Sequence, residues 1–159
     1  IGVSWKSSDM SPNRLSNYAF ISDLSPILKI PNVTFINLQY KDFVDNLTEI
    51  QCKLGVTVNN FDDLDHYNNI DDVAALSTAL DIVVSIKNTV PIIAAGVGTL
   101  TKLANWRQSP WSNVLFNPTS SAVDILEKNT WEPWSDVFSQ IADDILKLKN
   151  YVNKLKGQY

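Results

Sequence analysis

Two short polar segments contain the residues most able to do chemistry. The first is Trp5-Lys6-Ser7-Ser8, which follows a strand-like start and offers a cation and two hydroxyl groups. The second is Lys87-Asn88-Thr89, which lies between a strongly apolar stretch and a helical one. Such a strand-to-helix loop can present free backbone N–H groups and the positive end of a helix dipole, both of which favour phosphate. Each segment is therefore either a phosphate site or an ordinary polar turn that caps a helix.

Other catalytic or metal-binding patterns are weak. His66 is the only histidine, and no Ser or Cys motif surrounds it, so a nucleophilic triad lacks local support and a solvated loop residue is the simpler interpretation. An acidic run near it consists of Asp62, Asp63, Asp65, Asp71 and Asp72. Loop solvation and helix capping explain this run, because no His or Cys at ligand spacing completes a metal site. Neither of the glycine-rich phosphate motifs, G-x-G-x-x-G and G-x-x-x-x-G-K-[ST], is present.

The elements that must position the two polar segments follow from the hydrophobic pattern. Strand-like runs alternate with helical ones, which is typical of an α/β domain with a mostly parallel sheet. The expected strands are residues 2–5, 33–38, 56–58, 81–86, 100–104 and 114–116. A helix or helical turns are expected within residues 15–28, and helices over 43–54, 71–80, 90–97 and 134–156. Gly55 is placed to end the second helix, and Asp71 and Asp72 to cap the third. The pattern predicts a Rossmann-like, doubly wound, mostly parallel sheet of about six strands with a long C-terminal helix.

This predicted fold brings the two polar segments together. In a doubly wound sheet the loops after the first and fourth expected strands flank the switch point of the strand order, where ligands bind. We therefore expect Lys6, Ser7, Asn88 and Thr89 to meet at the carboxyl end of the sheet.

The last expected helix, residues 134–156, has a regular apolar stripe. The stripe alternates three and four residues apart and consists of Phe138, Ile141, Ile145, Leu148, Val152 and Leu155. Core packing is one explanation for it. Because the helix is longer than one sheet face needs, its far end could instead dock on a neighbouring domain or on a second chain.

Composition narrows the class of protein. The chain has 159 residues, of which 45% are hydrophobic, and 13 Lys and Arg against 17 Asp and Glu give a net charge of -4. This length supports a single core without metal or disulfides, and Cys52 is the only cysteine. A net acidic chain with two arginines argues against nucleic acid as the main partner. No apolar run reaches the length of about 18 residues that a membrane span needs. The strand-like start without Met leads us to expect a piece of a longer protein.

Several blocks, taken in order, resemble a known family. They are residues 1–8, 31–40, 70–76, 79–85, 109–111 and 115–116. Their order is similar to the C-terminal domain of bacterial glycosyltransferases that follow tetratricopeptide repeats, which are similar to O-linked N-acetylglucosamine transferases and to the heptosyltransferases of lipopolysaccharide synthesis. The resemblance spans about residues 1 to 145.

The resemblance implies a single domain over residues 1–159, the half of a two-domain (GT-B type) sugar transferase that holds the nucleotide-sugar donor. Lys6 matches the lysine that meets the donor diphosphate, with Ser7 beside it, and Asn88 and Thr89 match the small polar pair that cradles the same phosphates. No metal and no cofactor are expected, since the nucleotide sugar is the substrate. The implied partner is an N-terminal acceptor and repeat region of the parent protein, in the cytoplasm, and the isolated domain should transfer no sugar.

A second hypothesis follows from a departure from the family pattern. Ile92 stands where the family usually has a histidine. A domain that kept the fold and lost the donor chemistry would act as an interaction or scaffold module through its long helix, for example as a homodimer. His66, Tyr67 and Asn68 lie in the loop where base and ribose contacts of the family tend to arise.

Overall fold

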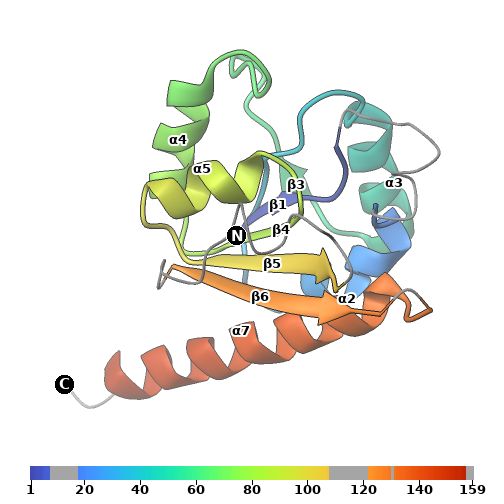
Figure 1. Ribbon diagram of the computed structural model, residues 1–159, viewed down its shortest axis with the longest axis vertical. Helices are drawn as coiled ribbons and strands as arrows, with labels where there is room; N and C mark the ends of the chain where they lie inside the picture. Colours follow the sequence, from blue (N-terminus) through green and yellow to red (C-terminus); the bar gives the residue numbers. More distant parts are fainter. Residues whose placement is uncertain (8–17, 108–121, 130, 157–159) are drawn as a thin grey trace.

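Six parallel strands form one sheet in the order β3-β2-β1-β4-β5-β6 (Figure 1). The computed structural model describes residues 1–7, 18–107, 122–129 and 131–156. The strands are β1 (Gly2–Ser4), β2 (Phe35–Asn37), β3 (Val58–Asn59), β4 (Val83–Ile86), β5 (Thr101–Trp106) and β6 (Val123–Lys128). The helices are the 3-10 helix η1 (Ile21–Leu24), α2 (Ser25–Leu28), α3 (Val44–Leu54), α4 (Ile70–Thr78), α5 (Val90–Gly96) and α7 (Trp134–Lys156).

This strand order confirms the predicted doubly wound, Rossmann-like fold, with every pairing parallel. β1 and β4 are neighbours, and the chain leaves β1 toward β2 and β4 toward β5, so the order reverses between them. Figure 1 shows α4 and α5 on one side of the sheet and α2, α3 and α7 on the other. The switch point therefore lies at the carboxyl ends of β1 and β4.

The two faces of the sheet pack into separate cores. The larger core joins Trp5, which follows β1, and Ile86 of β4 to Leu24, Ile27 and Phe138 of the covering helices. The smaller core gathers Leu38, Tyr40, Val83, Val90 and Ala94 under α4 and α5. Central parallel strands buried on both faces read as nearly continuous apolar runs, which is why residues 81–86 are recognisable as a strand from the sequence.

Three sequence expectations have different outcomes. The expected strand 114–116 lies outside the described part of the chain, and the sixth described strand is Val123–Lys128. The expected cap of α4 is wrong: Asn69 caps this helix, because its side chain accepts the N–H of Asp72, and the two aspartates occupy the first turn. The helical turns expected within residues 15–28, described from residue 18, are confirmed as η1 and α2.

The long helix α7 runs over its predicted span and packs along β5 and β6. Its contact with the sheet includes a buried cation: Lys102 of β5, 5% exposed, pairs with Asp124 of β6 and lies 3.8 Å from Asp144 of α7. The lysine thus links three elements on one face of the sheet. Gly55, at φ +67°, ends α3 as predicted, in the left-handed conformation that favours glycine.

Candidate functional site

The two polar loops meet at the switch point. The Asn88 amide Nδ2 donates to the Ser4 hydroxyl at 2.8 Å and to the Lys6 carbonyl at 3.2 Å. Ser4 and Ser85 are register partners in the β1–β4 pairing, so these loops leave adjacent strands at the same level. The expected juxtaposition of Lys6 and Asn88 is therefore confirmed, and Asn88 joins the two loops directly.

Gln39, at the end of the β2 segment, organises the Lys6 loop from the other side. Its fully buried Oε1 accepts the Ser4 hydroxyl at 3.2 Å and the backbone N–H groups of Trp5 and Lys6 at 3.0 and 2.9 Å. Its Nε2 donates to the Tyr40 carbonyl at 2.7 Å. One side chain thus satisfies two backbone donors that a strand end would otherwise leave unpaired.

Lys6 reaches the loop that follows β2. Its Nζ donates to the Asp42 carbonyl at 2.7 Å. Lys41 and Asp42 both have positive φ, +55° and +46°, a conformation that costs non-glycine residues energy. Backbone strain of this kind gathers at ligand clamps and switch regions, so this loop is part of the candidate site.

The start of α5 has fewer free N–H groups than expected. Asn88 Oδ1 accepts the Val90 N–H at 2.9 Å, and the next residue is a proline, which has no N–H. The amides of Ile92 and Ile93 both donate to the Thr89 carbonyl at 3.1 Å. A first turn rich in free donors is therefore a wrong expectation. The amides of Asn88 and Thr89 themselves have no partner among the described residues, which leaves two donors at the switch point.

Ser7 and Thr89, the other two predicted site residues, lie next to Lys6 and Asn88 in the same two loops. The Tyr40 hydroxyl donates to Ser7 Oγ at 3.4 Å. Ser7 is therefore linked to the segment that follows β2. Thr89 is exposed, and its hydroxyl does not cap α5. Both hydroxyl groups can therefore donate to an anion with little rearrangement.

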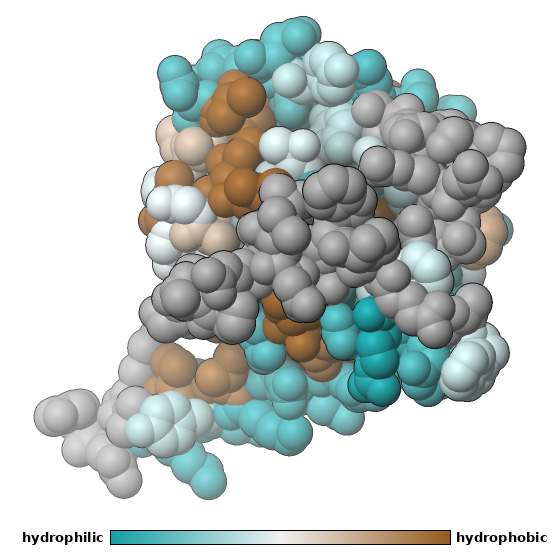
Figure 2. Space-filling model, in the orientation of Figure 1, coloured by the Kyte–Doolittle hydropathy of each residue, from teal (hydrophilic) through white to brown (hydrophobic). Residues whose placement is uncertain are grey.

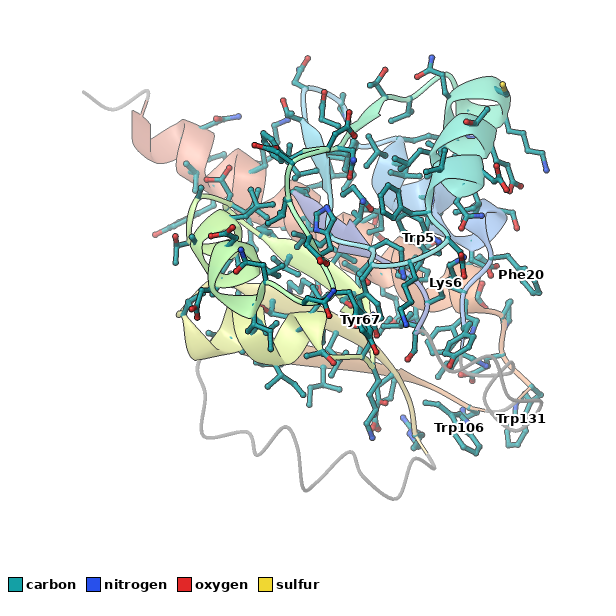
Figure 3. All side chains as sticks on the ribbon, turned by 90° about the horizontal axis from the view of Figure 1, so that it is seen from above. Trp5, Lys6, Phe20, Tyr67, Trp106 and Trp131 are labelled. Atoms are coloured by element: carbon teal, nitrogen blue, oxygen red, sulfur yellow. The ribbon has the colours of Figure 1, made fainter. Side chains whose placement is uncertain are left out.

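An aromatic and basic cluster lies next to Ser7, and the sequence pattern did not single it out. Tyr40 and Tyr67 have ring centroids 5.9 Å apart, and the Lys41 ammonium lies 3.8 Å from the Tyr67 ring centre. Figure 3 shows Tyr67 near Lys6 and Trp5, although it comes from the loop between β3 and α4. No local pattern predicts this contact, because it joins Lys41 and Tyr67, 26 residues apart in two loops that only the fold brings together.

His66 is half-buried, and the interpretation of a fully solvated residue is wrong. Asn60 Oδ1 accepts from Asn37 at 2.9 Å, and Asn60 Nδ2 donates to Asp62 at 2.7 Å, which assigns Oδ1 as the acceptor. His66 Nε2, 3.3 Å from that oxygen, is then the protonated nitrogen, and Nδ1 is buried with no partner among the described residues. Burial lowers the pKa of His66, and Asp65 opposes this shift. The ring is therefore neutral near pH 7 and lies edge-on to Phe43.

The described residues contain neither a cluster of metal ligands nor a membrane-spanning helix. Among the described residues, no three His, Cys, Asp or Glu side chains come together as a metal site would require. The helices in the described part of the chain are all too short or too polar to cross a bilayer.

Comparison with known proteins shows a distant relative. Over 137 residues, which are 84% of this chain, the sequence is 29% identical to Protein FlbA of Caulobacter vibrioides. The match covers 23% of FlbA, so the chain spans less than a quarter of that relative's length. No family model matches the chain, and no solved structure matches it significantly. The function is therefore inferred from the chain's own residues.

Proposed function

We propose that the domain binds the diphosphate of a nucleotide sugar at the switch point and is the donor half of a glycosyltransferase-like protein. The observation that carries the proposal is the junction of the two loops, where Asn88 holds the Lys6 segment beside the start of α5. Ligands of doubly wound sheets bind at this switch point. Lys6 supplies a positive charge there, and Ser7 and Thr89 supply hydroxyl groups.

The chemistry of sugar transfer gives these groups a role. When the bond between the sugar and the diphosphate breaks, negative charge develops on the leaving phosphate oxygen. A preorganised ammonium and backbone N–H groups stabilise such charge, an effect of several kcal/mol in comparable sites. In this proposal the Lys6 ammonium and the amides of Asn88 and Thr89 are those donors, and no metal or other cofactor takes part.

The acceptor side of the reaction belongs, in this proposal, to an N-terminal region of a longer cytoplasmic protein with tetratricopeptide repeats. The match to less than a quarter of FlbA is compatible with such a parent. Phe20 and Trp131, 77% and 79% exposed, give this domain aromatic surface for contact with an acceptor half. Figure 3 shows both at the periphery of the molecule, away from Tyr67.

Calorimetry tests the proposal directly. The wild-type chain is titrated with inorganic pyrophosphate and with UDP-, GDP-, ADP- and CMP-sugars. We expect binding of at least one nucleotide sugar, and we expect Lys6→Ala to weaken it about tenfold, the worth of one hydrogen bond to a charged group. Lys53→Ala removes an exposed lysine on α3 and is the matched control. Unchanged affinity in Lys6→Ala contradicts the assigned role of Lys6.

A second candidate function is a scaffold without donor chemistry. The observation that favours it is the internal use of the polar groups: both polar atoms of the Asn88 side chain and the Oε1 of Gln39 are already hydrogen-bonded within the chain. Ile92, at the position of the family histidine, is 41% exposed and offers no polar group. A thermal-shift screen with no response to any nucleotide sugar supports this function over the first.

A further inference from the structure

The apolar stripe of α7 has two halves with different surroundings. Phe138, Ile141 and Ile145 are buried against the sheet. Leu148 and Val152 continue the same three-four spacing, yet they are 39% and 44% exposed. This spacing is the pattern by which one helix packs against another. The distal half of α7 therefore has a helix-packing seam and, among the described residues, no helix packed on it.

The seam faces a groove at the amino end of the sheet, opposite the switch point. The groove has a volume of about 840 Å³, with Leu148 and Val152 on one wall and Leu76, Leu80 and Ile82 among the residues of the others. Figure 1 shows α7 continuing past the sheet, and Figure 2 shows hydrophobic side chains beside a hollow over this distal part. The groove is thus an apolar surface large enough to take part of a helix.

A tether holds the distal helix over the groove. The Lys149 ammonium donates to the carbonyl oxygens of Pro31 and Asn32, in the turn before β2. These bonds fix the position of the helix end relative to the sheet. The seam is therefore presented in one orientation and does not depend on the partner for its geometry.

Charge along α7 indicates what covers the seam. The acidic residues, Asp136, Asp143 and Asp144, all precede Ile145, and the basic residues, Lys147, Lys149, Lys154 and Lys156, all follow it. Two copies of this helix packed side by side in parallel would place lysines against lysines. Packed antiparallel about the Leu148–Val152 region, they place position 156 of each helix opposite Asp144 of the other, so the basic end of one helix lies beside Asp143 and Asp144 of its partner.

We propose that two copies of the chain form a dimer through the distal half of α7, with the helices antiparallel and each seam covering the groove of the other copy. A twofold axis makes the patch self-complementary and closes the assembly at two chains. In this arrangement Leu148 of one copy packs against Val152 of the other. The interface lies at the amino end of the sheet, so it does not depend on nucleotide binding at the carboxyl end.

Sedimentation analysis of the full chain is the first test. We expect wild type to sediment as two chains at high concentration and to dissociate on dilution. Val152→Asp places a carboxylate in the seam, and we expect this variant to be a single chain with unchanged circular dichroism. Asn150→Asp adds the same charge at an exposed position outside the seam and should leave the dimer intact. A single chain for wild type at every concentration, or a Val152→Asp dimer, overturns the proposal.

Disulfide crosslinking tests the antiparallel pairing and does not need a disruptive variant. In a Cys52→Ser background, Leu148→Cys protein is mixed with Val152→Cys protein and oxidised. The antiparallel arrangement predicts crosslinks mainly in the mixture, because it brings position 148 opposite position 152. Crosslinks that form mainly within each variant alone indicate parallel helices and overturn the proposal. No crosslink in any sample also overturns it.

Discussion

The two ends of the sheet differ in polarity: one is joined by hydrogen bonds and the other has an apolar groove. At the carboxyl end, the side chains of Gln39 and Asn88 both bond to Ser4 and to the backbone around Lys6, so the loops there are joined by polar contacts. At the amino end, Leu76, Leu80 and Leu148 line an open apolar groove. Polar contacts have directions and fix a specific geometry, whereas an apolar surface gains stability from any partner that removes it from water. The two proposals therefore assign a polar ligand to the first end and a second chain to the other.

The largest loss in the free energy of unfolding is expected for Gln39→Met, at the carboxyl end of the sheet. Methionine has a similar shape but leaves the buried N–H groups of Trp5 and Lys6 without an acceptor. Unpaired buried donors cost about 1–3 kcal/mol each, so we expect a loss of about 3 kcal/mol in the free energy of unfolding by urea.

Gln51→Met provides the control for that substitution. Gln51 is exposed on α3, where its Oε1 accepts the Thr57 hydroxyl. We expect its effect to stay within about 0.5 kcal/mol, as is usual at the surface. Equal losses in the two variants would show that the Gln39 network contributes nothing beyond a surface contact.

An intermediate effect is expected for Gly2→Ala at the amino end. A Cβ at Gly2 would lie 2.5 Å from one Leu38 methyl and 2.6 Å from one Leu80 methyl. Leu80 lines the groove and can shift into it, so we expect a loss near the lower limit for overpacking, about 1 kcal/mol. The same urea titration, done on the dimer, should show a larger loss, because the partner helix then occupies the space.

Gly96→Ala is expected to raise the free energy of unfolding, and it serves as the comparison for Gly2→Ala. Apart from its chain neighbours and the backbone of its own helix, no atom of the described residues lies within 4 Å of the added Cβ at this position in α5. Replacing an unhindered helical glycine stabilises by about 0.5–1 kcal/mol. A loss of equal size at both glycines would mean that the Leu38 and Leu80 contacts are not the cause of the loss at Gly2.

The smallest effect is expected at His66, where the carboxyl end is incompletely paired. Burial lowers the pKa of His66 in the folded chain below its ordinary value of 6.5, so the unfolded chain binds more protons as the pH falls below 6.5. The contribution of His66 to stability is complete above that pH and is lost as the pH falls through the folded pKa. Urea titrations at about pH 7.5 and about pH 5.5 should show a smaller pH dependence in His66→Gln than in wild type. An unchanged pH dependence would exclude His66 as its source.

The sequence predicted those parts of the fold whose signals are local. The span of α7 follows from a stripe that repeats over six positions, and the end of α3 follows from Gly55. The meeting of Lys6 and Asn88 follows from a topological rule, because both loops leave the carboxyl ends of strands that flank the reversal.

The features that were missed depend on partners distant in sequence. β6, Val-Asp-Ile-Leu-Glu-Lys, is assigned to no element by the sequence pattern, and the contacts that hold it pair Asp124 and Glu127 with Lys102 and Asn105 of β5. Gln39 is likewise an ordinary polar residue after a strand until its oxygen meets the backbone of Trp5 and Lys6, more than thirty positions away. No local pattern records such contacts.

Under the proposed function, the left-handed pair Lys41–Asp42 connects anion binding to loop conformation. Each residue holds a backbone conformation that costs about 1 kcal/mol, and among the contacts that keep the loop in place is the bond from the Lys6 ammonium to the Asp42 carbonyl. An anion that draws Lys6 to itself removes this contact and allows the loop to relax. Anion binding and loop relaxation then favour each other equally. A substitution that stabilises the relaxed loop would also raise the affinity for the anion, even at a position that does not contact the anion.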